Sequence, residues 1–389
     1  MKKTIKESVF IVIFILSSFT LKAQESISLK KKKAIEYALQ YNKVLQNAKF
    51  SVQSTKEKIR ETTAAGLPQA SASVDYNNFL GGNAELRLDP TAPPAIIEFN
   101  PTSSFKFSVN QLVFSGSYYV GLQLAKLAYQ TSGLNSQKTE LDIKEQVTRA
   151  YYLVLVSERA VKIIEANKIN SKKVYEKTRN LANAGIIEKT EADKLSVMVT
   201  SVENAQKAAE RQLEMAYNLL RLQLGADAKS EINLTTQLDE VSQQSKFENA
   251  IVNPFNIENN IDYNLGLMQG KISKSQISLQ KTNYLPTLAA FYSYTEKLLK
   301  PKFDMTPKNV VGLNLSIPIF SSGMKKSKVA QAKINLHMAE TTSQLVNQQL
   351  TIQEKQLRYN LNNMLEQYQN QKMNVDIAKE VFDKMNLKF

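Results

Sequence analysis

Hydrophobic periodicity divides the chain into long helical stretches and short extended ones. Residues 116–184 contain no proline, and their apolar positions recur every seven residues with a one-residue stagger midway: Val120, Leu127, Leu134, Leu141, Val147, Val154 and Val161. A seven-residue repeat predicts the narrow seam of a coiled coil. At ~1.5 Å of rise per residue, such a helix would be about 100 Å long. We therefore expect an extended structure built around it.

A glycine and a second helical pattern turn the long helix into a hairpin. Gly185 follows the long helix directly, and glycine readily adopts the left-handed backbone that ends helices. From Thr190 to Leu224 the apolar residues again step by threes and fours, which predicts a return helix. A further helix is predicted over residues 33–66, before Pro68. Because these two shorter helices together match the long one in length, we expect them to stack end to end beside it.

Strict alternation of apolar and polar residues follows the first Leu-Pro pair. Ala70, Ala72, Val74 and Tyr76 alternate there with Ser71, Ser73, Asp75 and Asn77. Three similar stretches occur near residues 105–115, 288–294 and 311–319. A period of two predicts β-strands with one apolar and one polar face. We expect the polar side to line water, and its members include Ser71, Ser73, Asp75, Asn110, Asn314 and Ser316.

The second half of the chain repeats the order of the first. Each strand pair begins at a Leu-Pro, with Pro68 and Pro286, and ends in a Phe-Ser motif that runs into Gly116 or Gly323. The two glycines are 207 residues apart, and similar residues recur at this spacing along the following helices. A constant offset predicts a duplicated unit of helix, two strands and long helix. The same spacing would place a second hairpin turn beyond Phe389, so we expect the second return helix to be missing.

The N-terminus predicts export. Lys2, Lys3 and Lys6 precede a short apolar run at residues 9–19, which is followed by Ala23. This arrangement is typical of a secretory signal peptide that is cleaved after a small residue, and the run is shorter than the ~20 residues that a membrane-spanning helix needs. The chain then divides into a signal peptide (1–23), a first repeat (24–225), a connector (226–253) and a second repeat without its return helix (254–389).

Composition argues against several classes of function. The chain has no cysteine and a single histidine, His337, so disulfides and thiolate or histidine-cluster metal centres are excluded, and a Ser-His-Asp triad is not expected. No nucleophile, base and orienting residue occur at a usable spacing, so we expect neither enzymatic activity nor a cofactor. The formal net charge is +14, but the lysines are scattered along the helices, which favours a solvated surface over nucleic-acid binding.

The four predicted strands are too few to close a membrane barrel by themselves. Such barrels have eight or more strands, and three copies of this chain would supply twelve. Strands of ~10 residues suffice to cross a bilayer when tilted, and closure removes the exposed edges of isolated strand pairs. The apolar side would then face lipid. A soluble antiparallel sheet with one core-facing side would show the same alternation and is the alternative.

This combination of motifs resembles the TolC-like outer-membrane efflux proteins of Gram-negative bacteria. It comprises the two Leu-Pro strand starts, the two Phe-Ser strand ends, the duplication and the hairpin sequence at residues 185–191. The resemblance implies a mainly α fold with two β-hairpins per chain, assembled as a homotrimer with a twelve-stranded barrel in outer-membrane lipid and a periplasmic helical tunnel. It also implies an exit duct of efflux or type I secretion, joined to a periplasmic adaptor and an inner-membrane pump.

The resemblance places the functional end of the molecule at the hairpin tip. It implies that Gly185 forms the tip turn, and that Thr190 and Glu191 correspond to a Thr-Asp pair that helps to hold the tip closed where the adaptor docks. Alternatively, Thr190 is only the N-cap of the return helix, and Glu191 and Asp193 are first-turn acids favoured by the helix dipole. The strand–helix junctions are the other candidate positions: Pro68, Gly116, Pro286 and Gly323.

Two other classes of protein share part of the pattern. A periplasmic adaptor (membrane fusion) protein also has a long helical hairpin, but it would carry a single hairpin with half of a lipoyl-like motif on each side. A non-transporting coiled-coil envelope protein would not need the alternating strands. Both remain alternatives to an outer-membrane channel at the level of the sequence.

Overall fold

The computed structural model describes residues 27–386, except 88–93, 237, 239–253 and 301–305. The predicted signal peptide and most of the predicted connector lie outside these residues. The chain forms two compact units, which we describe separately. Unit 1 comprises Met1–Lys49 and Ser136–Asn253, and unit 2 comprises Phe50–Asn135 and Pro254–Phe389. The predicted boundaries of the sequence repeats remain a prediction.

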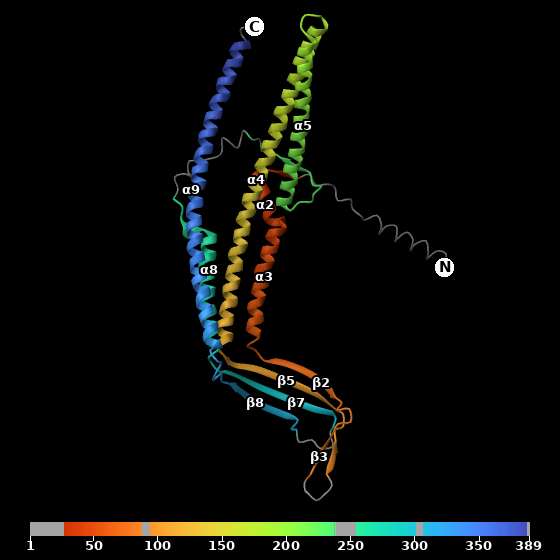
Figure 1. Cartoon of the computed structure of the whole chain (residues 1–389), viewed down its shortest axis with the longest axis vertical. Coiled ribbons are helices and arrows are strands. Elements are labelled where there is room, and N and C mark those ends of the chain that lie inside the picture. Colours follow the sequence, from red (N-terminus) through yellow and green to blue (C-terminus); the bar gives the residue numbers. More distant parts are fainter. Residues whose placement is uncertain (1–26, 88–93, 237, 239–253, 301–305, 387–389) are drawn as a thin grey trace, which may run out of the picture. The chain divides into compact units, whose positions relative to one another are not determined.

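The helical hairpin that the heptad pattern predicts is confirmed. Helix α4 runs over Gly116–Asn183, and α5 runs over Lys189–Leu224, one residue earlier than expected (Figure 1). In unit 1, the heptad positions Val147 and Val154 of α4 are completely buried, together with Tyr151. They pack with a set of apolar side chains from α2 (Lys31–Tyr41), α3 (Lys43–Ala64) and α5, namely Ala34, Ala38, Leu45, Leu220 and Leu224. This cluster is the core of unit 1.

A short parallel strand pair borders the same core. Strand β1 (Ile27–Leu29) pairs with β6 (Ile232–Leu234). The Tyr151 hydroxyl of α4 donates to the carbonyl of Leu29 at 3.2 Å. Strand β6 lies within the segment expected to be an irregular connector, where three residues are too few to give a detectable alternation.

The helix predicted over residues 33–66 is wrong in one respect, because it is broken at Asn42. The backbone there is extended (ψ 125°), and the side-chain carbonyl accepts the N–H groups of Val44 and Leu45 at 2.9 and 3.2 Å. Asn42 therefore ends α2 and caps α3. Its amide donates to the carbonyl of Gln223 at 2.7 Å, so the end of α5 meets the chain at this break. The predicted end-to-end stacking of the two shorter helices remains a prediction.

The four predicted strands form one antiparallel sheet in unit 2. Its order is β2-β5-β7-β8 (Figure 1), with strand bounds Gln69–Asn77, Thr102–Ser115, Thr287–Leu299 and Asn309–Ser316. Strand β8 ends earlier than expected, since Ile317 and Ile319 lie beyond it. Pro318 separates these two residues, and proline cannot donate to a strand ladder.

The register of the sheet keeps like residues on the same face. Ala72 pairs with Phe107, which pairs with Tyr294, while Ser71 pairs with Ser108, which pairs with Ser293. Because neighbouring side chains across a ladder point the same way, most apolar positions of the strands share one face, which Gln111, Glu296 and Asn309 interrupt. The polar positions form the other face, on which the Ser71 and Ser108 hydroxyls lie 3.1 Å apart.

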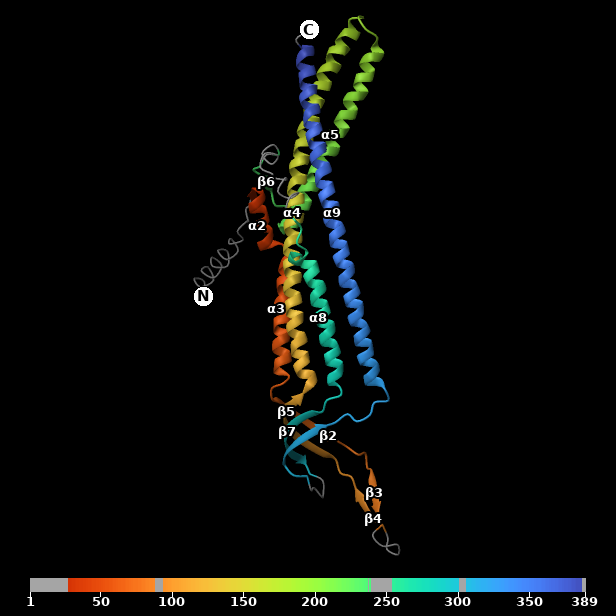
Figure 2. The same ribbon diagram turned by 90° about the vertical axis from the view of Figure 1, so that its left-hand side faces the viewer.

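The region between β2 and β5, which was expected to be a loop, contains a small β-hairpin. Strands β3 (Asn83–Leu86) and β4 (Ala95–Glu98) pair antiparallel (Figure 2). At its base the Phe79 and Phe99 rings lie 5.6 Å apart. These strands were not predicted, because each has only four residues and the surrounding segment is rich in glycine and proline.

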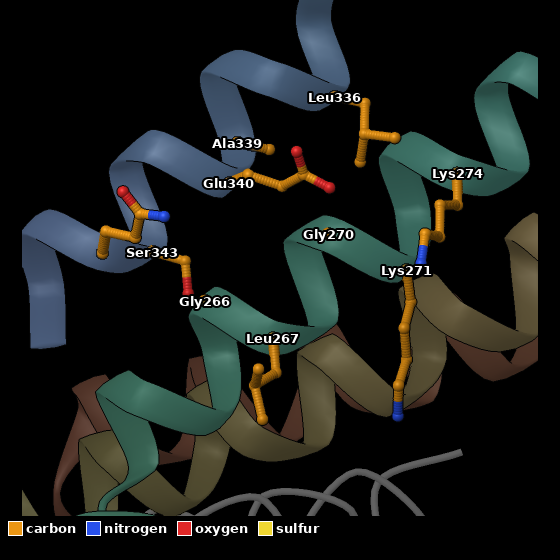
Figure 3. Close-up of a pocket in the computed structure, with 10 residues that line it drawn as sticks. Gly266, Leu267, Gly270, Lys271, Lys274, Leu336, Ala339, Glu340 and Ser343 are labelled. Atoms are coloured by element: carbon orange, nitrogen blue, oxygen red, sulfur yellow. The ribbon is translucent and has the colours of Figure 1, made fainter. Parts of the chain in front are cut away.

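Two further helices complete unit 2. Helix α8 (Ile261–Thr282) packs along α9 (Met324–Asn386), the predicted second long helix. A Cβ atom on Gly266 would lie 3.3 Å from the Ser343 hydroxyl, so small residues let the two helices approach closely at this point. The residues around it line an open groove between the two helices (Figure 3). In the part of the chain that the structure describes, no helix combines the length and apolar character needed to cross a membrane.

Candidate functional site

The hairpin tip is built around Gly185, as the sequence predicts. Its φ is +72°, a left-handed value that favours glycine. The N–H of Ile186 donates to the carbonyl of Leu181 at 2.9 Å, and the N–H of Gly185 donates to that of Ala182 at 3.0 Å. This pair of bonds is a Schellman motif. It closes the last turn of α4 and reverses the chain toward α5.

Thr190 does not cap α5, so the alternative role predicted for it is wrong. The N-cap position is Glu188, and Thr190 lies inside the first turn of a helix that begins at Lys189. The Thr190 hydroxyl instead donates to the Glu188 carboxylate at 3.1 Å. This bond ties the first turn of α5 to the residue before it.

The acids of the tip lie on the exposed surface of the first turns of α5. Glu191 is a first-turn acid, as the alternative reading expected, and it forms an ion pair with Lys194 at 2.7 Å. Asp193 is also exposed, whereas Ala192 between them is 5% exposed. Gly185 thus lies in the turn that ends α4, and Thr190 and Glu191 lie in the first turn of α5 that follows it. A gating role for them remains a prediction.

An apolar side chain stands at this polar tip. Ile186 directly follows the turn glycine and is 68% exposed. Its exposure was not predictable from the sequence, because one isoleucine after a helix carries no periodic signal. Its position beside a left-handed glycine was the only available cue.

Ionic and hydrogen-bonded pairs link α4 to α5 away from the tip. Lys172 and Glu203 form an ion pair at 2.7 Å. The hydrogen bond and charge of Lys172 lower the pKa of the Glu203 carboxyl below its ordinary value. Farther along the hairpin, the Tyr217 hydroxyl donates to the Glu158 carboxylate at 2.5 Å. Burial and this hydrogen bond both raise the pKa of the Tyr217 hydroxyl above its ordinary value. These pairs set how the two helices meet.

At the junctions of the first repeat, glycines lie against the side chains of neighbouring residues in unit 2. At the start of α4, a Cβ atom on Gly116 would lie 2.8 Å from a methyl group of Leu285, the residue before Pro286. At Gly66, just before Pro68, a Cβ atom would lie 2.5 Å from the Tyr118 ring. A side chain at either glycine would therefore displace the neighbouring Leu285 or Tyr118 side chain.

The second repeat builds its junction differently. Gly323 has a φ of +82°, which lets the chain turn from β8 into α9. The Lys325 ammonium lies 5.4 Å from the centroid of the Tyr284 ring. Tyr284 precedes Leu-Pro in the second repeat, as Gly66 does in the first. In the first repeat the aromatic ring belongs to Tyr118 of the long helix, whereas in the second it belongs to the residue before Leu-Pro.

Clustered metal ligands are not found among the described residues. Within them, no group of three or more His, Cys, Asp or Glu side chains is placed to hold a metal ion.

Comparison with known proteins relates the whole arrangement to one family. A family model described as outer membrane efflux protein matches residues 34–226 and 271–389. Over 296 residues the chain is 25% identical to the outer membrane protein TolC of Salmonella enteritidis, a match that covers 72% of this chain and 56% of that protein. The chain therefore spans little more than half the length of this relative.

Solved structures show the same fold. The outer membrane channel CmeC of Campylobacter jejuni superposes with a TM-score of 0.65 at 15% identity, covering 88% of this chain and 74% of that one. A membrane protein from Pseudomonas aeruginosa gives a TM-score of 0.63 at 16% identity, covering 86% and 76%. The predicted fold class is thereby confirmed as mainly helical with a few strands, and the assembly of these strands into a trimeric membrane barrel remains a prediction.

The family match also bears on location and class of activity. It covers both strand pairs and both long helices, and the named relatives are outer-membrane proteins or channels rather than enzymes. The chain is accordingly an outer-membrane protein whose helical part lies in the periplasm. This chain belongs to the outer membrane efflux protein family.

Proposed function

We propose that this chain forms the exit duct of a tripartite efflux or type I secretion system, through which small molecules or proteins cross the outer membrane. The observation that carries the proposal is the sheet with one mainly apolar face. That face is uncovered within the chain: Val74 is 65%, Val311 82% and Leu313 71% exposed. An antiparallel sheet in water would bury such a face against a core, so lipid is its natural surrounding.

The edges of the sheet favour a homotrimer. Strands β2 and β8 are its outer strands, and open edges pair readily with other strands. Three copies would join β2 of one chain to β8 of the next and close twelve strands into a barrel. The apolar face would then contact outer-membrane lipid, and the polar face, with Ser71, Ser73 and Asp75, would line the duct.

The hairpin tip supplies the contact with the rest of the export machine. Its exposed Ile186 and the acids Glu191 and Asp193 offer a mixed apolar and acidic surface. We assign to this surface the docking of a periplasmic adaptor that connects the duct to an inner-membrane pump. Gly185, Thr190 and Glu191 would control closure of the tip.

The duct has no chemistry of its own in this proposal. Neither a catalytic constellation nor a cofactor is required, because the pump supplies the energy and the choice of substrate. The adaptor class is disfavoured by the four-stranded sheet, and a purely structural coiled coil is disfavoured by its exposed apolar face.

Membrane fractionation of the full chain in a Gram-negative host tests the proposal. We expect recovery in the outer membrane, resistance to alkaline extraction, and a gel mobility that changes on boiling, as a closed barrel requires. Recovery only in the soluble periplasm would contradict the proposal and favour the adaptor or coiled-coil alternatives.

A further inference from the structure

Apolar and basic residues follow one another where β8 passes into α9. Ile319 is 94% exposed and Phe320 is 85% exposed, just after the end of the strand. The helix that follows begins with Lys325, Lys326 and Lys328 in its first five residues. An exposed apolar segment beside a cluster of lysines is typical of a surface that meets a membrane.

The charge of these lysines is not neutralised within the neighbouring chain. Residues 306–339 contain five lysines and no aspartate or glutamate, and one of these lysines, Lys308, pairs with Glu296 at 2.8 Å. Lys326 and Lys328 are exposed and form no ion pair with another described residue. Positive charge in the first turn of a helix also opposes the helix dipole. Their positions therefore stabilise neither the helix nor an ion pair among the described residues, and they suit an anionic partner outside the chain.

The corresponding place in the first repeat also carries residues that suit a membrane surface. Counting back 207 residues from Lys325 and Lys326 leads to Tyr118 and Tyr119 at the start of α4. The Tyr119 side chain is 58% exposed. Tyrosine and lysine are among the side chains that anchor proteins at the boundary between lipid and water. Both junctions therefore have an interfacial composition, although their residues differ.

We propose that Lys326 and Lys328, next to the exposed Ile319 and Phe320, form a binding surface for the phosphate headgroups of anionic phospholipids. The inference rests on the proposed insertion of the sheet, which puts its helix-bearing end at the face of the membrane from which α4 and α9 leave. The two apolar side chains reach the acyl chains there, and the two ammonium groups meet the phosphates.

The expected size of the effect follows from general membrane electrostatics. Each lysine near an anionic surface strengthens binding by about fivefold, and added salt weakens this attraction. Removing both charges should therefore lower the affinity for anionic lipid by about 25-fold at most. Binding of zwitterionic lipid should change little.

Native mass spectrometry of the full chain in detergent, offered equimolar phosphatidylglycerol and phosphatidylcholine, tests this inference. We expect preferential retention of phosphatidylglycerol, which K326Q/K328Q should lose and K326R/K328R should keep. The matched control K372Q/K379Q removes two exposed lysines from the same helix, far along the sequence from the strand end, and should retain the preference.

Two results would overturn the inference. One is equal retention of both lipids by the unaltered chain, a comparison that does not depend on any variant. The other is an equal loss of preference in K326Q/K328Q and K372Q/K379Q, which would reduce the effect to overall charge. If the chain still fractionates with the outer membrane in either case, the proposed duct stands and only the headgroup site fails. Absence from the outer membrane would overturn both.

Discussion

Gly225 provides a direct test of how closely the chain packs in unit 1. Its φ is +71°, and a Cβ atom there would lie 2.4 Å from the carbonyl oxygen of Tyr41 and 2.9 Å from the Cα of Asn42. Gly225→Ala therefore adds left-handed backbone strain of about 1–2 kcal/mol. It also adds a clash with backbone, whose relief by a chain shift costs a further ~1–3 kcal/mol. We expect the free energy of unfolding to fall by about 2–5 kcal/mol.

Gly185→Ala is the matched control for this substitution. Its φ is almost the same, +72°, but a Cβ atom there would meet nothing within 4 Å. Only the strain of about 1–2 kcal/mol remains. Urea unfolding of the detergent-solubilised chain, followed by circular dichroism, compares the two variants, and hydrogen exchange in α2 and α5 locates the loss. Equal destabilisation by the two substitutions would refute the close approach at Gly225.

Three further perturbations have defined outcomes. Asn42→Ala removes the cap of α3 and should cost about 1–2 kcal/mol in the same unfolding assay, whereas no loss would show that the break at this residue needs no cap. Gly66→Ala should displace the Tyr118 ring and free its hydroxyl, which donates to the Thr63 carbonyl at 3.2 Å; an unchanged tyrosine near-ultraviolet spectrum would contradict this. Lys172 lowers the pKa of the Glu203 carboxyl below its ordinary value of 4.5. The ion pair therefore stabilises the fold fully above pH 4.5, and this stabilisation is lost as the pH falls through the lowered pKa. Acid should therefore loosen α4 from α5 less in Glu203→Gln than in the unaltered chain, and identical acid profiles by hydrogen exchange would count against the ion pair.

Long-range periodicity made most of the architecture predictable. The heptads of α4 and the two-residue alternation of the strands are local signals that repeat many times, so helix and strand bounds agree within a few residues. The alternation also predicted which side chains share a face, and the register Ser71–Ser108–Ser293 bears this out. The end of β8 was overestimated because the apolar alternation continues through Pro318 to Ile319.

Features that depend on distant partners were not predictable. The break at Asn42 contains neither glycine nor proline, and it is held by the carbonyl of Gln223, far along the chain. The pair of Lys172 and Glu203 requires knowledge of how α5 lies against α4. At the tip, Thr190 is a residue type that favours the N-cap, yet the turn at Gly185 places Glu188 there instead.

The central claim is that one face of the sheet meets lipid and the other meets water. Because the chain has no cysteine, single cysteines can be introduced and labelled without background. Ser73→Cys and Val74→Cys place neighbouring thiols on opposite faces of β2, and both side chains are exposed in the isolated chain, Val74 by 65%. In outer membranes, a membrane-impermeant maleimide should label Ser73→Cys rapidly and leave Val74→Cys unlabelled until detergent is added. Equal labelling of both thiols in intact membranes would contradict the account.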